Sequence, residues 1–446
     1  MRRIADKNDC RRVRVVRINS RLNVGGIARH ITWLTAGLVE HGFDTTLITG
    51  SVSPGEEDMA AFAASQGVNP LLLSEMGREI VLRDLVTVWK LYRLLVHLRP
   101  AIVHTHASKA GAVGRIAGLL YRWLTPGTLW GRPRACRLVH TFHGHIFHSY
   151  YGLWKTRLFL GIERLLARWA TDRIVVISPQ QRKEIHEAFG VGRASQFAVI
   201  PLGLDLEMFR DWPCRRSVLR RELSAAPEEV LVGIVGRLTE IKNHHLFLQM
   251  VVRYKEISPT GPRVRFVVIG NGHLRGTLEK ACHELGLSQD IQFLGHRDDP
   301  ENFYPGLDVV ALTSRNEGTP LSLIEAMANG RPVLATAVGG VVDLLGPAME
   351  GTVAVDAFKI CAHGVATGSE DSVALAHGLR RLVLDESLRR RMGEQAQAFV
   401  QNHYAQSRLL ADIAGLYQEL LKPEGQVATQ NGEASAPHSQ NACVGG

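Results

Sequence analysis

The chain has 446 residues, of which 45% are hydrophobic and 21% charged, so it is an ordinary globular protein with room for two domains of about 200 residues each. No stretch approaches the roughly 18 apolar residues that a membrane span requires, and the basic start lacks the apolar core of a signal peptide. The six cysteines show no CxxC spacing, which argues against a disulfide framework and indicates a reduced, cytoplasmic setting.

The net charge of +9 is unevenly distributed. Residues 1–200 contain 28 Lys and Arg against 14 Asp and Glu, and residues 101–162 contain eight basic residues and no acid. Aromatic residues are interleaved in this acid-free stretch: Trp123, Trp130, Tyr150, Tyr151 and Trp154. Such a surface suits an anionic membrane or a phosphorylated acceptor. A solvated basic face with the aromatic rings in the core explains the same residues, and the sequence leaves both interpretations open.

The first predicted elements form a βαβ unit. Residues 13–19 (VRVVRIN) and 45–49 (TTLIT) have the apolar, β-branched character of strands, and residues 27–40 between them have a helical pattern. Gly25 and Gly26 allow a tight turn and a close approach of the backbone to a phosphate, although a turn alone explains them equally well. The pair lacks the full GxGxxG fingerprint, so a dinucleotide is not favoured.

Two HxH pairs, His104 with His106 and His143 with His145, lie at the ends of neighbouring predicted strands (101–106 and 137–143). Imidazole is the commonest metal ligand, so a zinc site is one interpretation. No acid or cysteine lies nearby in the sequence to complete such a site. We therefore expect no metal, a hydrogen-bonding role in a cleft for His143, and a structural role for His104.

The strand pattern continues at residues 173–178 and 197–201 and then restarts in the second half of the chain. Predicted strands there cover residues 230–236, 264–270, 291–295, 308–314 and 332–336. Alternating strands and helices in both halves predict two doubly wound parallel sheets. The expected parts are a basic segment (1–12), a first domain (13–205), a second domain (206–403), a helix packed back on the first domain (404–421) and a polar, disordered tail (422–446).

Arg237 and Lys242 follow the first strand of the second domain, in the stretch GIVGRLTEIKNHH. Two cations that converge beside helix N–H groups neutralise a diphosphate, although either residue alone is common in surface loops. No Asp-x-Asp motif occurs in the chain to hold a metal ion. An enzyme that handles nucleotide diphosphates without Mg²⁺ must supply cations from its own side chains, and these two residues meet that requirement.

The stretch NEGTPLSLIEAMANGRPVLAT (316–336) follows the predicted strand 308–314. Thr319 is predicted to be the N-cap of the next helix and Pro320 its first residue. The loop lies at the carboxyl end of a parallel strand, where open sheets bind ligands, and a helix amino terminus there is a natural anion site.

Two acids, Glu317 and Glu325, accompany this anion site. Acids beside an anion must contact something else, such as sugar hydroxyls, so the pattern indicates a ligand that combines phosphate with sugar. The structural alternative is that Glu317 is a surface acid and that Glu325 is a partly buried helix acid paired with an arginine.

Taken together, these motifs resemble the retaining glycosyltransferases of the GT-B fold, and specifically glycosyltransferase family four, over residues 13–421. The most specific element is Glu317 and Glu325 with seven residues between them, followed by AMANGRPVLAT. VGRLTEIKNH, IPLGLDLEMF and FLGHRDD agree in order and spacing, while GGIARH, HTHASKAG and HTFHGHIF look like members that build bacterial surface polysaccharides.

The resemblance implies two Rossmann-like domains that face a cleft, with a nucleotide diphosphate-sugar held mainly by the second domain and with no cofactor. By position, Glu325 would hold the ribose and Glu317 would contact the donor sugar or the leaving phosphate. Arg237 and Lys242 would grip the diphosphate, Gly26 would approach it, and His143 would face the donor sugar or the acceptor hydroxyl. The backbone from Gly318 through Thr319, Pro320 and Leu321 to Ser322 would cap the diphosphate.

The implied activity is a retaining, metal-independent hexosyl transfer from a UDP-sugar to a lipid-linked or glycan acceptor of cell-surface polysaccharide. The expected location is the inner face of the cytoplasmic membrane, bound peripherally, and no nucleic-acid partner is expected. Arg29 and His30 are expected to be packing or cleft-rim residues. Two alternatives stay open: a sugar-nucleotide epimerase of the same architecture, and a non-catalytic sugar-nucleotide-binding protein.

Overall fold

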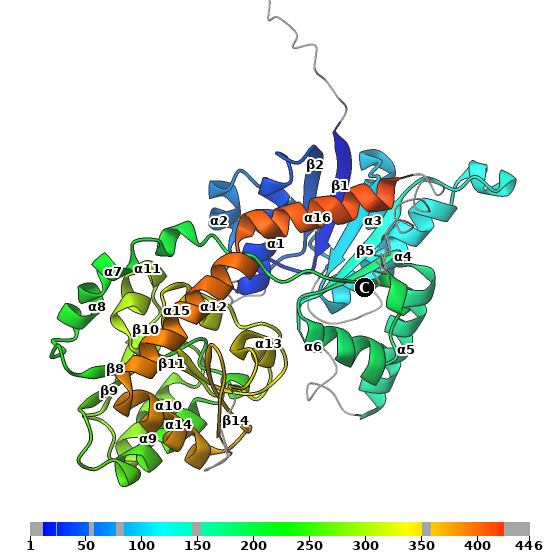
Figure 1. Ribbon diagram of the computed structural model, residues 1–446. Coiled ribbons are helices and arrows are strands. Elements are labelled where there is room, and N and C mark those ends of the chain that lie inside the picture. The colour runs from blue at the N-terminus through cyan, green and yellow to red at the C-terminus, as the bar shows by residue number, and fades with distance from the viewer. Residues whose placement is uncertain are drawn as a thin grey trace, which may run out of the picture.

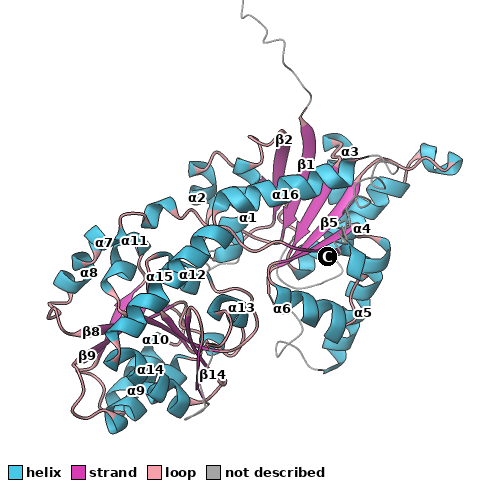
Figure 2. Ribbon diagram, viewed as in Figure 1, coloured by secondary structure: helices cyan, strands magenta, loops and turns pink. Residues whose placement is uncertain are grey.

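The computed structural model describes residues 12–23, 25–52, 58–76, 84–144, 153–349 and 358–422, without the side chains of 153–155. The basic amino-terminal segment, His145, Tyr150, Tyr151, the Trp154 side chain and the polar tail lie outside this description. Two α/β domains lie side by side, each built on a sheet between helices (Figures 1 and 2). Of the helices described, none combines the length and apolar character that crossing a membrane requires.

The sheet of the first domain has seven strands in the order β3-β2-β1-β4-β5-β6-β7, and all neighbours are parallel. The strands are β1 (Val13–Asn19), β2 (Phe43–Thr49), β3 (Leu71–Leu72), β4 (Ile102–His106), β5 (Arg137–Phe142), β6 (Arg173–Val176) and β7 (Phe197–Val199). The order reverses between β1 and β4, and the carboxyl ends of strands at such a reversal are where open parallel sheets bind ligands.

Helices cover both faces of this sheet. They are α1 (Gly26–Gly37), α2 (Ala60–Ser65), α3 (Asp84–Leu98), α4 (Ser108–Trp123), α5 (Leu153–Trp169) and α6 (Pro179–Arg182), with short turns η1 (Pro126–Trp130), η2 (Lys183–Ala188) and η3 (Ala194–Gln196). Apolar side chains of α3, α4 and α5 share one core with β1 and β4. Residues of α1 pack on the opposite face.

The sheet of the second domain has the order β10-β9-β8-β11-β12-β14-β13. Its strands are β8 (Val230–Val235), β9 (Val264–Ile269), β10 (Ile291–Gly295), β11 (Val309–Leu312), β12 (Val333–Thr336), β13 (Phe358–Ile360) and β14 (Gly364–Thr367). The last two form an antiparallel pair at one edge that the sequence pattern did not predict, because each has only three or four residues. The other neighbours are parallel, and the order reverses between β8 and β11.

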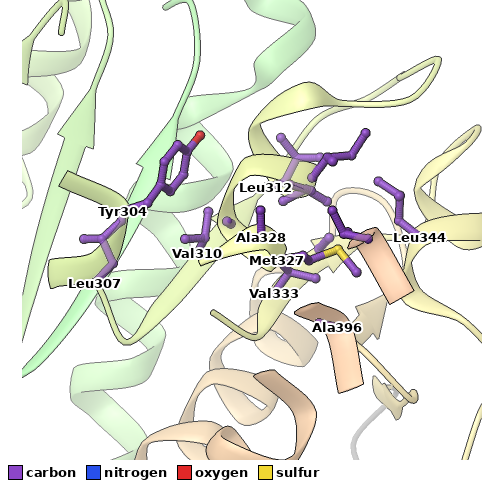
Figure 3. Close-up of a cluster of buried hydrophobic side chains, with 14 of the residues drawn as sticks. Tyr304, Leu307, Val310, Leu312, Met327, Ala328, Val333, Leu344 and Ala396 are labelled. Atoms are coloured by element: carbon purple, nitrogen blue, oxygen red, sulfur yellow. The ribbon is translucent and has the colours of Figure 1, made fainter. Parts of the chain in front are cut away.

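The helices of the second domain are α7 (Trp212–Arg215), α8 (Ser217–Glu222), α9 (His244–Ile257), α10 (Arg275–Glu284), α11 (Pro300–Phe303), α12 (Leu321–Ala328), α13 (Val341–Leu345), α14 (Ser372–Leu384) and α15 (Glu386–His403), with turns η4 (Glu207–Phe209), η5 (Glu240–Lys242) and η6 (Tyr304–Gly306). One core lies on each face of the sheet. Met327 of α12, Val333 of β12 and Ala396 of α15 meet in the core shown in Figure 3. This core fixes α12 against the sheet.

The chain passes between the domains twice, at adjacent places. The N–H of Leu204 donates to the carbonyl oxygen of Tyr404 at 2.8 Å, and the N–H of Gln406 donates to the carbonyl oxygen of Leu204 at 2.9 Å. The last helix, α16 (Gln406–Leu421), then lies across the first domain (Figure 1). Its buried residues, including Ile413 and Tyr417, share a core with β1, β4 and β5.

The acid-free stretch 101–162 does not form one free cationic surface. Three of its cations pair with acids from elsewhere in the chain: Lys109 with Asp84, Arg115 with Glu163, and Arg122 with Asp172. Arg137 donates a hydrogen bond to the carbonyl oxygen of Leu420. Trp123 and Trp130 are 49% and 75% exposed, so these two rings are not core residues. The stretch is therefore neither a free cationic surface throughout nor a basic face with all of its aromatic rings in the core.

Candidate active site between the two domains

The site of the second domain lies where β8 and β11 end, at the reversal of strand order. Lys242 ends the short turn η5 after β8, and Glu317 lies in the loop between β11 and α12. The Lys242 ammonium donates to the Glu317 carboxylate over 2.5 Å, and the Ser314 hydroxyl donates to the same oxygen over 2.6 Å. Thr313 ties the two loops together, because its hydroxyl donates to the Lys242 carbonyl oxygen at 3.1 Å.

This ion pair is largely shielded from solvent, since the side chains of Lys242 and Glu317 are only 21% and 11% exposed. An ammonium group carries three donors, so Lys242 can hold Glu317 and still donate to a ligand. Arg237, which also follows β8, is exposed and forms no ion pair with Glu317 or Glu325 in the part of the chain described. Lys242 is therefore held in an ion pair, whereas Arg237 is exposed and is held by neither of the two site acids.

The helix α12 begins at Leu321, with Pro320 as its N-cap in extended conformation. The predicted N-cap Thr319 is wrong by one residue, because the chain turns into the helix only after the proline. The Thr319 hydroxyl is buried and has no hydrogen-bond partner among the described residues. No side chain caps the helix, so the first N–H groups of α12, at Leu321 and Ser322, lack the side-chain acceptor that would normally satisfy them. This end of α12 is suited to an anion.

Glu325 lies one turn further along α12 and is 14% exposed. The Tyr304 hydroxyl donates to its carboxylate at 3.0 Å, and Arg29 of the first domain lies 3.7 Å away. Burial raises the pKa of Glu325, and the nearby Arg29 charge opposes that shift. The arginine partner is the arrangement that the structural alternative anticipated for this acid. It also places Arg29, expected only as a rim or packing residue, at the site.

The two domains contact each other directly here. A Cβ atom on Gly318 would lie 2.6 Å from the carbonyl oxygen of His143, and one on Gly26 would lie 2.6 Å from a terminal carbon of Leu321. A side chain at position 318 would push the domains apart, because backbone cannot yield, whereas at position 26 the end of the Leu321 side chain would have to move. The structure thus brings Gly26 and His143 of the first domain against Leu321 and Gly318 at the amino terminus of α12.

On the first domain, the partly buried His143 adjoins the buried imidazoles of His30 and His106. Its Nε2 lies 2.9 Å from Nδ1 of His106, and its ring lies 5.0 Å from that of His30. Burial lowers the pKa of His143 to about 4 and the pKa values of His30, His104 and His106 to well below 6.5. These rings are therefore neutral at neutral pH and act as hydrogen-bonding groups rather than as cations.

His104 is fully buried beneath this group, stacked on His106 at 4.3 Å between ring centres. Its two ring nitrogens lie 2.6 Å from the Tyr417 hydroxyl and 2.7 Å from the Thr141 hydroxyl. These partners fix the ring between β4 and β5, and they give His104 a packing role rather than a place in the cleft.

The nitrogen atoms of His30, His106 and His143 all lie within 4.8 Å of one another, a grouping that can hold a metal ion. The HxH pairs do not predict this group, because His30 comes from α1 and not from either pair. The group contains no carboxylate or thiolate. The buried guanidinium of Arg17 lies 3.5 Å from His104, so a cation here would face an uncompensated positive charge. This chemistry disfavours a metal, and its absence stays a prediction.

Ser314 and Tyr304 contact the two acids and were not predicted from the sequence, whereas Arg29 and His30 were expected as packing or cleft-rim residues. A closer role for Arg29 and His30 was detectable, because they lie three and four positions after Gly26 and so share its face of α1. Tyr304 was not, since η6 is distant from α12 in sequence and only the packing of the domain brings its hydroxyl to Glu325.

Comparisons with known proteins divide the chain as the two sheets do. Residues 24–208 match the family model described as Glycosyltransferase Family 4, and residues 216–399 match the model described as Glycosyl transferases group 1. An Escherichia coli protein named UDP-Gal:alpha-D-GlcNAc-diphosphoundecaprenol alpha-1,3-galactosyltransferase is 29% identical over 58% of this chain. The match spans 64% of that relative, which is less than two thirds of its length.

The Staphylococcus aureus capsular polysaccharide biosynthesis glycosyltransferase CapM is 25% identical over 78% of this chain and 84% of its own length. Among solved structures, Anabaena HepE in complex with UDP superimposes with a TM-score of 0.72 over 91% of this chain and all of HepE, at 19% identity. A likeness at that identity establishes the fold, which is GT-B.

Proposed function

The chain belongs to the glycosyltransferases of the GT-B fold, with a family 4 domain followed by a group 1 domain, and from this premise we propose that it transfers a hexose from a UDP-sugar with retention of configuration. The observation that carries the proposal is the joint position of Lys242, Glu317 and the uncapped start of α12 at the end of β11. The proposed acceptor is a lipid-linked saccharide or glycan of a cell-surface polysaccharide. The names of the E. coli and S. aureus relatives support that class.

The diphosphate of the donor would lie against the amino terminus of α12. Backbone N–H groups there, together with the Lys242 ammonium, complement its negative charge. Arg237 is exposed and unpaired with the site acids, so it is available to close on the same diphosphate. Glu325 would accept hydrogen bonds from the ribose hydroxyls, with Tyr304 and Arg29 keeping its carboxylate in position.

Transfer would proceed with the sugar leaving as an oxocarbenium-like species. Stabilising the departing diphosphate is then the largest contribution to rate, and Lys242 and Arg237 supply it from side chains without a metal ion. Lys242 and Ser314 hold the Glu317 carboxylate in place. Glu317 would contact the donor sugar, while Lys242 would contact the diphosphate. The acceptor hydroxyl would attack on the face that the diphosphate leaves, and the leaving phosphate would take its proton, which retains configuration.

His143 would face the donor sugar or the acceptor hydroxyl from the first domain. It is neutral, and its Nε2 is engaged with His106, so Nδ1 is the atom available to a substrate. The contacts of Gly26 with Leu321 and of Gly318 with His143 support a closed arrangement in which water is kept from the donor.

The proposed location is the inner face of the cytoplasmic membrane, where a lipid-linked acceptor lies. Exposed Trp123 and Trp130 and the excess of Lys and Arg in residues 1–200 support a peripheral association with anionic lipid.

Thermal unfolding of the purified protein with UDP, GDP and ADP tests the donor. We expect UDP to raise the unfolding temperature most, because ligand at about 100 times its Kd adds about 2.7 kcal/mol to the stability of the native state. A Glu325→Ala variant provides the matched control and should lose most of the shift. Absence of any shift with all three nucleotides would contradict the donor assignment. Incubation with a UDP-sugar alone then separates transfer from epimerisation, because an epimerase changes the sugar without an acceptor.

A further inference from the structure

The outward face of α5 carries two parallel stripes of opposite chemistry. One stripe is basic and the other is apolar, and both repeat with spacings of seven and four residues: Arg157, Arg164 and Arg168, beside Leu158, Leu165 and Trp169. The three apolar side chains are 63%, 60% and 63% exposed. Since these spacings return to the same side of a helix, each stripe is continuous over about three turns.

Among the described residues, no ion pair joins an acid to Arg157, Arg164 or Arg168. The helix contains one acid, Glu163, which is buried and pairs with Arg115 over 2.6 Å. In Figure 1, α5 lies on the outside of the first domain, on the side away from the second domain. Both stripes are therefore available to a partner without any rearrangement of the site.

A pocket of about 510 Å³ adjoins the carboxyl end of the basic stripe. Arg164, Arg168 and Arg193 line it, together with Trp169 and Gln196, and none of its lining residues in the described chain is acidic. Arg164 is held in place because its Nε donates to the carbonyl oxygen of Phe189 at 2.9 Å. The Arg168 guanidinium lies 5.6 Å from the centre of the Trp169 ring. Three guanidinium groups with no acidic partner in the part of the chain that the structure describes make this pocket suited to a phosphate.

The pocket and the donor site lie at opposite edges of the sheet of the first domain. Gln196 directly precedes β7, and Trp169 lies shortly before β6, which begins at Arg173, so the pocket lies at the amino ends of these strands, whereas the donor site lies at the carboxyl ends. An anion bound in the pocket is therefore not the donor diphosphate.

We propose that the outward face of α5 and this three-arginine pocket dock the protein on an anionic bilayer, with the phosphate of a lipid headgroup in the pocket and the apolar stripe in the interface. The apolar stripe decides between a lipid and a free anion, because exposed Leu and Trp contribute nothing to binding a soluble phosphate and stabilise insertion at an interface. Each arginine near an anionic surface raises the affinity about fivefold. The inference rests on the proposed membrane location, and it assigns the contact to α5 rather than to the acid-free stretch as a whole.

Co-sedimentation with phosphatidylcholine vesicles, with and without phosphatidylglycerol, tests the assignment at low and high salt. We expect binding only with phosphatidylglycerol at low salt, and a loss of affinity of at least about tenfold in Arg168→Glu/Arg193→Glu and, separately, in Leu158→Ser/Leu165→Ser. Arg380→Glu/Arg390→Glu changes the charge equally on exposed residues of the second domain and should bind as the unmodified protein does. Equal binding by all variants would overturn the proposal.

Two further measurements separate the outcomes. The unfolding shift with UDP should be unchanged in the α5 variants, so a fault in the donor assignment is seen independently of the membrane result. Stabilisation by inorganic phosphate that is lost in Arg168→Glu/Arg193→Glu, with vesicle binding intact, would make the pocket a site for a soluble anion and would refute the lipid headgroup.

Discussion

Lys242 Nζ lies 2.5 Å from Oε1 of Glu317, although the two residues come from loops after different strands. The pair holds a cation and an acid together at the edge of the sheet where β8 and β11 end. Each group limits the motion of the other, so removal of either one changes the position and the charge environment of its partner.

Lys242→Ala should lower kcat at least about tenfold, because it removes a positive charge from the leaving group. Steady-state transfer measured against Lys255→Ala provides the control, since Lys255 pairs with Asp290 at an exposed position on α9. Arg237→Ala should have an effect of similar size. Near-normal turnover in both Lys242→Ala and Arg237→Ala would contradict the proposal that these two residues bind the diphosphate.

Glu325→Ala should mainly weaken UDP binding, whereas Glu317→Ala should mainly slow transfer. The reason is that Glu325 would hold the ribose and Glu317 would contact the reacting sugar. Calorimetric Kd values for UDP, combined with kcat for each variant, separate the two roles. The opposite pattern would mean that the two roles are exchanged.

Gly318→Ala should lower kcat with little change in the unfolding temperature. A Cβ at this position meets the His143 carbonyl oxygen at 2.6 Å, and backbone cannot yield, so the contact between the domains is lost while each domain keeps its own core. Gly26→Ala is the milder comparison, because its Cβ meets only the end of the Leu321 side chain. Equal activity of Gly318→Ala and the unmodified enzyme would show that this domain contact is not part of turnover.

Transfer should continue in the presence of a chelator. The site offers cationic side chains to the diphosphate, and the histidine group adjoins a buried arginine instead of an acid. The test measures transfer before and after dialysis against a chelator, both in the unmodified protein and in His30→Gln, which removes one imidazole of the histidine group. Activity that disappears in chelator and returns with Mg²⁺ or Mn²⁺ would contradict the proposal.

The free energy of unfolding should fall as the pH is lowered from about 6.5 towards 4. Burial lowers the pKa values of His143 and His244 to about 4, so between these limits the unfolded chain binds protons that the folded chain excludes. At pH 5 each such histidine costs about 2 kcal/mol, and the cost vanishes above the unfolded pKa.

Denaturant titrations across this pH range measure the effect. His244→Leu should flatten the dependence by about one proton, or about 1.4 kcal/mol per pH unit. His245→Leu, at the exposed neighbouring position, is the control and should leave the slope as it is. A stability that stays constant from pH 7 to 4.5 would show that these rings are not held neutral.

The sequence predicts the long strands well, because each is an apolar run that a parallel sheet buries on both faces. It misses the edge pair β13 and β14, whose three or four residues carry too little pattern. The N-cap of α12 is shifted by one residue, since Thr319 and Pro320 both satisfy the rules for a helix start and only the backbone geometry separates them.

Contacts between residues that are distant in the chain explain the features of the site and the surface that the sequence does not predict. The acid-free stretch looks like a cationic surface until Asp84, Glu163 and Asp172, all outside it, take three of its cations. The three-histidine group is likewise assembled from α1, β4 and the end of β5. Local patterns identify the residues at the cleft, but which acid meets which cation depends on the tertiary fold.

The position of α16 has a consequence for how this protein is made. The core of the first domain lacks Tyr417 and the rest of α16 until residue 421 has left the ribosome. The last residue of the first domain, 205, has emerged long before that. At 5–20 residues per second, the roughly 200 residues in between take about 10 to 40 seconds. For that time Arg17 and His104 lack the hydroxyl that contacts them in the finished protein, and an apolar face over β1 and β4 stays uncovered. The nascent chain is therefore most exposed to aggregation and to chaperones while the second domain is being synthesised, and the last helix ends that period.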